Sequence, residues 1–358
     1  MAGTVRNLSY AVSFNGTTLT NVVSFRWSLG YDLSSGEAEI VLPLKSDAGT
    51  YFDDVSIIVD GSTRWSGLLY EWNYRLYPRA VSMICKGRLA RADDYKLPTV
   101  SDTRDKGLLL DDLTGGPATD EAIVSAVLDY AGVGTNGGSI GGTGQTLGTI
   151  APEEFVWNYS DSALSYIHKI DAISLGYRTF ESVGGQIYRV QISGRPDSGP
   201  ELTFTEGVDI REGQTSRTVS EAYNAVRISG YAVGDYLDPR VWYQAESNPF
   251  MSESQPRVYT QDNPMIERRA NESAGEGISC QALAEYWLRE LNREIVKVTM
   301  RTPRADVIGP GQVHLVQGPG GSADRMGVGE VLWVQRCDGE LTQDGAFSQS
   351  ITYVGGGT

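Results

Sequence analysis

Short stretches of alternating apolar and polar residues, closed by tight-turn pairs, are the feature that most constrains the fold of this protein. Apolar residues occupy every second position from Leu8 to Phe14, and Asn15-Gly16 follows directly. Such alternation places the apolar side chains on one face of a strand, and Asn-Gly favours the positive φ angles of a two-residue hairpin turn. A second apolar segment ends at Asp60-Gly61, another favoured turn pair. We therefore predict antiparallel hairpins.

Further strand-like segments cluster near both ends of the sequence, and turn signals rich in glycine and proline separate them. This distribution predicts an α+β fold that is mostly β, with a β module at each end and a mixed centre. The predicted strands, besides the first, cover residues 37–44, 55–59, 63–70, 79–86, 222–230, 296–300, 312–317, 331–337 and 347–353.

The centre of the sequence has helical patterns. Thr119 is a predicted N-cap, apolar residues follow at helical spacing, and Gly132 ends this helix. A second helix begins at Ser160 or Asp161 and ends at Gly176; a hairpin across Gly184-Gly185 follows it. A third helix is predicted over residues 279–293. The glycine-rich residues 132–148 predict an exposed, mobile loop, and the polar residues 235–272 indicate no regular element.

The charge and cysteine content restrict the function. Lys and Arg total 30 against 45 Asp and Glu, a net charge of −15, which disfavours sequence-independent binding to nucleic acid or to anionic membranes. No apolar run is long enough for a membrane span, and we expect no signal peptide. Cys85, Cys280 and Cys337 lie too far apart for a zinc motif and fit a reducing compartment. We expect no metal site and no cofactor.

One short motif is typical of hydrolases. Residues 137–141 read G-x-S-x-G, the nucleophile elbow, with Ser139 at its centre. An elbow needs a strand that runs into it, whereas a helix precedes this loop. A triad would also need His314, which the pattern places on the polar face of a strand, and His168 is the only other histidine. We interpret the motif as a chance match in a loop, and His168 as a structural residue.

Two other groups of residues leave alternative functions open. Adjacent carboxylates could serve a glycosidase, although neighbouring residues on a strand point to opposite faces. An aromatic cluster could form a sugar platform or an oligomer contact. The alternatives are therefore a cell-wall-degrading hydrolase and a β-rich carbohydrate-binding module. The residues concerned are Asp53-Asp54, Asp93-Asp94, Asp111-Asp112 and Glu153-Glu154 for the first, and Trp65, Tyr70, Trp72 and Tyr74 for the second.

The order of the segments along the sequence resembles the phage tail hub family, the baseplate-hub or tail-tip proteins of long-tailed phages and contractile injection systems. No single segment is specific, and the resemblance depends on their order over most of the protein. Residues 235–272 match least. The segments are NVVSFRWSLGYDLSSGEAEIVLP from Asn21, residues 63–91, the helix AIVSAVLDYAGV from Ala122, residues 162–196, EAYNAVRISG from Glu221, the helix-to-strand junction at residues 282–300, and Pro310-Gly311.

This resemblance implies a structural protein without catalytic residues. Family members form a trimeric ring at the distal end of the tail, and each copy supplies two small antiparallel β-barrels of tail-tube type. Six barrels then surround the channel and adapt a three-fold tip to a six-fold tube. On this sequence the first barrel corresponds to residues 1–100, a helix and hairpin domain to 101–199, the second barrel to 200–235 plus 295–358, and an insertion with the late helix to 236–294.

The resemblance also implies the partners and the location. The expected partners are two further copies of the protein, a distal tail or tail-tube protein, the tape-measure protein, and a separate spike, fibre or tip protein. DNA would pass without specific binding, because carboxylates repel phosphate. Assembly in the host cytoplasm and a final place at the virion tail tip follow. Since the sequence stops just after its last predicted strand, we expect a minimal hub.

Overall fold

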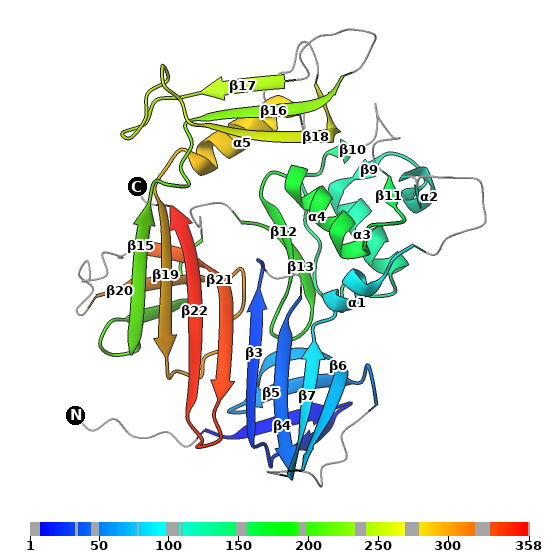
Figure 1. The fold of residues 1–358 in the computed structure, drawn as a ribbon, viewed down its shortest axis with the longest axis vertical. Coiled ribbons are helices and arrows are strands. Elements are labelled where there is room, and N and C mark those ends of the chain that lie inside the picture. The colour runs from blue at the N-terminus through cyan, green and yellow to red at the C-terminus, as the bar shows by residue number, and fades with distance from the viewer. Residues whose placement is uncertain are drawn as a thin grey trace.

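The computed structural model describes residues 8–32, 35–43, 50–76, 79–97, 107–108, 110–147, 156–192, 198–232, 241–268, 279–318 and 330–356. The fold is mostly β, as predicted, with five helices in these ranges. Figure 1 shows a large sheet below, a small sheet with one helix above, and the remaining helices beside them.

The N-terminal β module follows the alternation of the sequence closely. Val12 and Phe14 are buried, and Asn15 and Gly16 have φ angles of 43° and 82°, which confirms the predicted hairpin turn. In the sheet the order is β3-β4-β7-β6-β5-β1-β2. The strands are β1 (Tyr10–Phe14), β2 (Thr17–Leu19), β3 (Ser24–Gly30), β4 (Glu37–Pro43), β5 (Asp54–Val59), β6 (Ser62–Leu76) and β7 (Arg79–Lys86).

The C-terminal β module has an equally regular pattern. Val296, Val298 and Met300 are buried, and the residues between them are more exposed. The order in the sheet is β15-β19-β22-β21; β20 pairs with β21, and β14 pairs with β20 in parallel. The strands are β14 (Leu202–Thr205), β15 (Glu212–Thr218), β19 (Ile295–Thr302), β20 (Val313–Gln317), β21 (Glu330–Leu341) and β22 (Phe347–Gly356).

The two modules share one continuous 13-stranded sheet, because β3 pairs with β21. At the centre of this pair Trp27 faces Gly339, and a Cβ atom on Gly339 would lie 2.0 Å from Cζ2 of Trp27. Only glycine leaves room for the indole ring there. The two predicted small antiparallel β-barrels are not confirmed, since no closed barrel is found among the described strands. β21 pairs with β20 and β22 of its own module and also with β3, which joins it to the N-terminal module.

The middle of the protein packs as helices around a hairpin. Ser162 caps α4 by accepting a hydrogen bond from the backbone of Ser165, whereas Thr119 sits at the N-cap of α3 without a side-chain cap. Gly132 and Gly176 have positive φ and follow these helices, as predicted. The elements are α1 (Leu89–Asp94), β8 (Gly107–Leu108), α2 (Leu110–Thr114), β9 (Ala118–Thr119), α3 (Asp120–Tyr130), β10 (Thr146–Leu147), β11 (Trp157–Asn158), α4 (Ala163–Ile173), β12 (Tyr177–Glu181) and β13 (Ile187–Gln191).

A separate three-stranded sheet contains the predicted strand at residues 222–230 together with two strands from residues 235–272, where the sequence predicted no element. β16 (Ala225–Ala232) lies between β17 (Val241–Ala245) and β18 (Val258–Arg268), and α5 (Cys280–Leu291) packs against it. β16, which the sequence grouped with the second β module, therefore has its partners here. β17 shows no fully buried position, so its alternation was too weak to be recognised.

Three hydrophobic cores follow this division. The largest holds the helices together with part of the small sheet, and one further core lies inside each β module. Leu341 and Phe347 of the C-terminal module pack into the N-terminal core, so the two modules share apolar contacts as well as backbone pairing. No helix in the described part of the protein is long and apolar enough to cross a membrane.

Candidate functional site: the polar face of the large sheet

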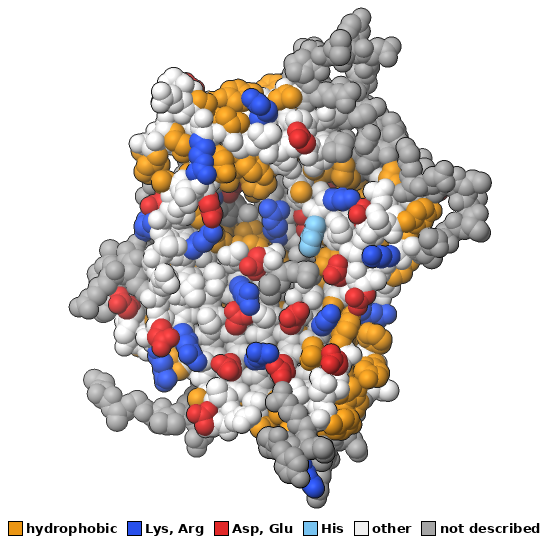
Figure 2. All heavy atoms as spheres, in the orientation of Figure 1, with side chains coloured by type: hydrophobic (Ala, Val, Ile, Leu, Met, Phe, Trp, Pro, Cys, Tyr) orange, Lys and Arg blue, Asp and Glu red, His pale blue; other side chains and the backbone are white. Residues whose placement is uncertain are grey.

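A groove of about 1230 Å³ lies on the polar face of the large sheet. Both β modules contribute to it, on either side of the β3–β21 pair. Figure 2 shows acidic and basic side chains interspersed over the sheet on this side of the molecule. The charged residues that line the groove are Arg26, Glu37, Glu39, Glu212, Arg301, Arg336, Asp338 and Glu340.

Strand alternation explains why charges gather on this face. On β3 the buried Phe25 and Trp27 point into the core, so Arg26 and Ser28 point to the groove. β4 likewise buries Ala38 and exposes its flanking glutamates. Because successive side chains point to opposite faces of a strand, one buried face in each module produces one shared polar face.

The groove is acidic overall, and part of its charge is compensated internally. Five carboxylates and three guanidinium groups give the lining a formal charge of −2. Arg26 pairs with Glu39 at 2.7 Å, and Arg336 pairs with Asp338 at 2.9 Å. The hydrogen bond and charge of Asp338 raise the pKa of the Arg336 guanidinium. These pairs leave the exposed Glu37, Glu212 and Glu340 against Arg301, and this surplus of carboxylates is the source of the negative potential.

The structure does not assemble the hydrolase motif into a triad. The predicted mobile loop is instead fixed beside β13, where Arg189 N donates to Ser139 O at 2.9 Å. His314, predicted on a polar face, is fully buried and its Nδ1 lies 3.0 Å from the Tyr353 hydroxyl. Burial lowers the pKa of His314 to about 4. His168 is exposed on α4, and neither imidazole has a hydrogen bond with Ser139 among the described residues.

The paired carboxylates are dispersed. Asp53 accepts from the backbone of Thr50, which is the main reason that the pKa of this carboxyl is lowered, and its neighbour Asp54 pairs with Arg88. Asp93 accepts from the hydroxyl of Ser162 at 2.9 Å. The pair Asp111-Asp112 lies on α2, where the side chain of Asp111 is outside the described set, and Glu153-Glu154 lies outside the described residues.

The aromatic cluster divides between core and surface. Trp65 is fully buried in the N-terminal core and cannot serve as a platform. Trp72 and Tyr74 stack at a ring distance of 6.0 Å, and Tyr74 is 67% exposed. Tyr70 contacts Phe52 edge to face. The sequence therefore correctly predicted an aromatic pair at the surface, Trp72 and Tyr74, but wrongly included the buried Trp65 in it.

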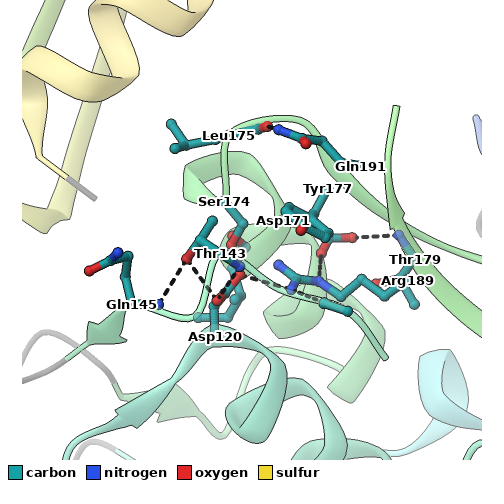
Figure 3. Close-up of polar contacts among 12 residues, drawn as sticks. Asp120, Thr143, Gln145, Asp171, Ser174, Leu175, Tyr177, Thr179, Arg189 and Gln191 are labelled. Carbon is teal, nitrogen blue, oxygen red and sulfur yellow. Dashed lines mark hydrogen bonds and ion pairs between the residues drawn. The ribbon is translucent and has the colours of Figure 1, made fainter. Parts of the chain in front are cut away.

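Sequence reasoning missed a buried ion network between α3, α4 and β13. Arg189 is fully buried; its Nη1 lies 2.8 Å from Oδ2 of Asp120 and its Nε lies 2.7 Å from Oδ1 of Asp171 (Figure 3). Burial alone would raise the pKa of Asp120, but the charge and hydrogen bond of Arg189 outweigh it and lower the pKa. No sequence motif marks Arg189, because an arginine within a hairpin strand such as β13 is usually exposed to solvent.

A second buried carboxylate joins the hairpin to the N-terminal module. Glu181 Oε2 accepts from Gly36 N at 3.0 Å, and its Oε1 accepts from Leu89 N at 2.6 Å. A Cβ atom on Gly87 would lie 1.7 Å from this carboxylate, so glycine is required there. Burial raises the pKa of Glu181 to about 7, although the backbone donors act in the opposite direction.

Comparison with known proteins shows which fold this is. No protein-family model and no curated protein matches the sequence. The structure is similar over 98% of its length to a tail protein from Neisseria meningitidis (97% of that protein, 12% identity, TM-score 0.66). It is similar over 97% to a 43 kDa tail protein of prophage MuSo2 from Shewanella oneidensis (96% of that protein, 10% identity, TM-score 0.59).

A third similar structure comes from a secretion system. The E. coli c3393 protein is described as a component of the type VI secretion system with structural similarity to the T4 tail proteins gp27 and gp5. The match spans 97% of the present protein and 77% of the E. coli protein, at 11% identity and a TM-score of 0.53. Since the similarity extends over almost the whole length of this protein, the resemblance found in the sequence is confirmed at the level of the fold: this protein has the fold of these phage tail proteins.

Proposed function

We propose that this protein is a structural tail hub, three copies of which close a ring at the distal end of a phage tail. The observation that carries the proposal is the polar face that both β modules share across the β3–β21 pair. Two modules in each copy give six modules in a trimer, which matches a three-fold tip to a six-fold tube. In this arrangement the acidic groove lines the channel.

The proposed role is not enzymatic. Among the residues that could supply acid–base or nucleophilic chemistry, those that the structure describes, such as Ser139, His314, Asp53 and Asp93, form their hydrogen bonds in different parts of the fold. The partners would be two further copies, a distal tail or tail-tube protein, the tape-measure protein, and a separate spike, fibre or tip protein. The location would be the virion tail tip, after assembly in the host cytoplasm.

The mass and position of the protein test this function. We expect native mass spectrometry of the protein with its tail-tube partner to give three copies of it per complex. Imaging of tails that carry a tag on this protein should show a three-fold ring with an open centre on the tail axis. A single copy away from the axis would contradict the proposal, whereas a monomer without partners would not.

Reversing the groove charge is expected to create DNA affinity. Glu37→Lys, Glu212→Lys and Glu340→Lys together change the lining charge from −2 to +4, since each reversal adds two units. Three lysines on one face form a basic patch that can contact DNA phosphates. We therefore expect non-specific binding to duplex DNA with a dissociation constant of about 10⁻⁴–10⁻⁶ M, which weakens steeply as the salt concentration rises. The wild type should show none by fluorescence anisotropy at the same salt concentration.

A matched control separates clustering from net charge. Asp129→Lys, Glu246→Lys and Glu253→Lys change the net charge by the same amount at exposed positions away from the groove. We expect this variant to bind DNA at least tenfold more weakly than the groove variant. Equal affinity of the two variants would show that the groove has no special role.

A further inference from the structure

The sheet that lines the groove ends in two free strand edges, which Figure 1 shows at its left (β15) and at its right (β6). β15 pairs only with β19. β6 pairs with β5 as far as Leu68 but with β7 as far as Leu76, so residues 71–76 have a neighbouring strand on one side only. Both edges border the groove, since Asn73 of β6 and Gln214 of β15 belong to its lining. Within the described ranges no further strand pairs with either edge.

These two edges lack the features that usually keep a free edge from pairing. Proteins protect free edges with very short strands, proline, charged side chains or β-bulges. β15 is seven residues long, contains no proline, and pairs with β19 in unbroken register; its central residues 213–216 are uncharged. In β6, residues 71–76 pair with β7 without a bulge, contain no proline, and are uncharged at 72–74. Both edges are therefore open to another strand.

Two other free edges of the protein are protected in the usual way. β2, at the far end of the large sheet, has only three residues. β18, at the edge of the small sheet, contains Pro264, and its register with β16 shifts between Ser229 and Tyr231. Since the same protein protects these edges and leaves β15 and residues 71–76 open, the open edges indicate a strand partner.

The strand order shows which partner fits. The sheet passes from β15 to β6 through eight strands, β15-β19-β22-β21-β3-β4-β7-β6, and every neighbouring pair is antiparallel. β15 and β6 therefore run in opposite directions. If copies are related by rotation about the axis of a ring, β15 of one copy meets β6 of the next copy in antiparallel orientation. A head-to-tail contact of this kind can close into a ring.

The side chains beside the two edges also match. Because Asn73 lines the groove, its neighbours Trp72 and Tyr74 lie on the opposite face of β6, where most of the Tyr74 ring is exposed. The same face of β15 carries Thr215, whose partner on β19 is the buried Val298. Aromatic and β-branched side chains pair favourably across antiparallel strands. A neighbouring β15 would therefore cover an aromatic ring that a single copy leaves exposed.

We propose that residues 71–76 of one copy pair with β15 of the next copy as antiparallel strands, and that this contact joins the copies of the ring. The proposal rests on the proposed hub function and names the surfaces by which the ring closes. Main-chain hydrogen bonds supply the affinity, and the alternation of side chains determines the face on which each residue lies. Asn73 then shares the groove face with Glu212, Gln214 and Ser216 of the next copy.

Cysteine pairs test this contact in the full-length protein, assembled with its tail-tube partner and mildly oxidised. Side chains opposite each other on one face of paired strands lie close enough for a disulfide. We expect at least one pair to give covalent species of two and three copies in non-reducing gels. Asn73→Cys is combined in turn with one cysteine at each groove-face position of β15, namely Glu212→Cys, Gln214→Cys, Ser216→Cys and Thr218→Cys.

The opposite face of β15 provides the matched controls. Asn73→Cys combined with Thr215→Cys or Arg217→Cys should give no such species, because these side chains point away from the groove face. Asn73→Cys with Thr260→Cys, an exposed position of the small sheet, controls for random collisions. The three native cysteines are buried and should not react. Cross-linking at every second position of β15 distinguishes strand pairing from simple proximity.

Native mass spectrometry of the same complexes separates this contact from the hub function. Three copies without a cross-link at any groove-face position would overturn the strand pairing and leave the hub function standing. Equal cross-linking on both faces of β15 would also overturn the pairing. If the complex with the tail-tube partner does not contain three copies, the hub function itself is wrong, and the proposed contact is wrong with it.

Discussion

Replacing Arg189 with leucine is expected to lower the free energy of unfolding by about 3–5 kcal/mol, because a buried charge pair loses one partner. Asp120 and Asp171 would remain buried without the cation that holds both of them. Chemical denaturation followed by circular dichroism measures the change. Lys169→Met is the control, since Lys169 is 44% exposed in its pair with Asp161 and an exposed pair contributes about 0–1 kcal/mol.

The pH dependence of stability and a compensating variant test whether Arg189 stabilises the protein through its charge. In the wild type the pKa of Asp120 is lowered, so its stabilising contribution is present at neutral pH and is lost as the pH falls. Without Arg189 the buried Asp120 carboxyl would take up a proton, so the stability lost in Arg189→Leu should shrink between pH 7 and pH 5. Adding Asp120→Asn and Asp171→Asn should restore at least half of it. No restoration would show that Arg189 acts by volume rather than by charge.

Replacing Glu181 with leucine is expected to lower the free energy of unfolding by about 2–6 kcal/mol at pH 4.5, because two buried N–H groups lose their acceptor at about 1–3 kcal/mol each. These groups belong to Gly36 and Leu89, at the start of β4 and of α1, so the junction between the hairpin and the N-terminal module should loosen first. Hydrogen exchange at these two amides reports the loosening directly. Glu71→Leu, at an exposed position of β6, is the control.

The destabilisation by Glu181→Leu should change with pH in the opposite direction to the destabilisation by Arg189→Leu. Burial raises the pKa of Glu181 from 4.5 to about 7, so the folded protein holds a proton that the unfolded protein releases. Its stabilising contribution is fully present below about pH 4.5 and is lost as the pH rises through 7, a change on the order of 3 kcal/mol. The destabilisation by Glu181→Leu should therefore be smaller at pH 8 than at pH 4.5. Equal values at both pH values would contradict the raised pKa.

Local elements were predictable where a rule connects nearby residues. β7 matches its predicted range of residues 79–86, and the turns at Asn15-Gly16 and Asp60-Gly61 have the expected positive φ angles. β17 and β18 were missed because neither shows a regular alternation of buried and exposed positions: β17 has no buried residue, and Ile266 is the one buried side chain among those described in β18.

The polar groove was only partly predictable. Alternation identifies which residues of β3 or β21 point away from a core, so the sequence predicts the polar face of each module separately. The sequence did not show that the two halves adjoin, since Trp27 and Gly339 are more than 300 positions apart. The family resemblance supplied the tail fold, but the two small antiparallel β-barrels that it implied are not confirmed among the described strands.

The sequence by itself determined the strand-rich composition, the buried faces of regularly alternating strands such as β1 and β19, the turns and most helix ends, because these depend on backbone preferences of residues close together in sequence. Only the tertiary structure decided the β3–β21 pair, the position of β16 in the small sheet, and the placing of Arg189 between Asp120 and Asp171. A period of two specifies a face but not a partner. Partners are chosen by packing and by the cost of leaving a buried charge unpaired, and both depend on residues far apart in sequence.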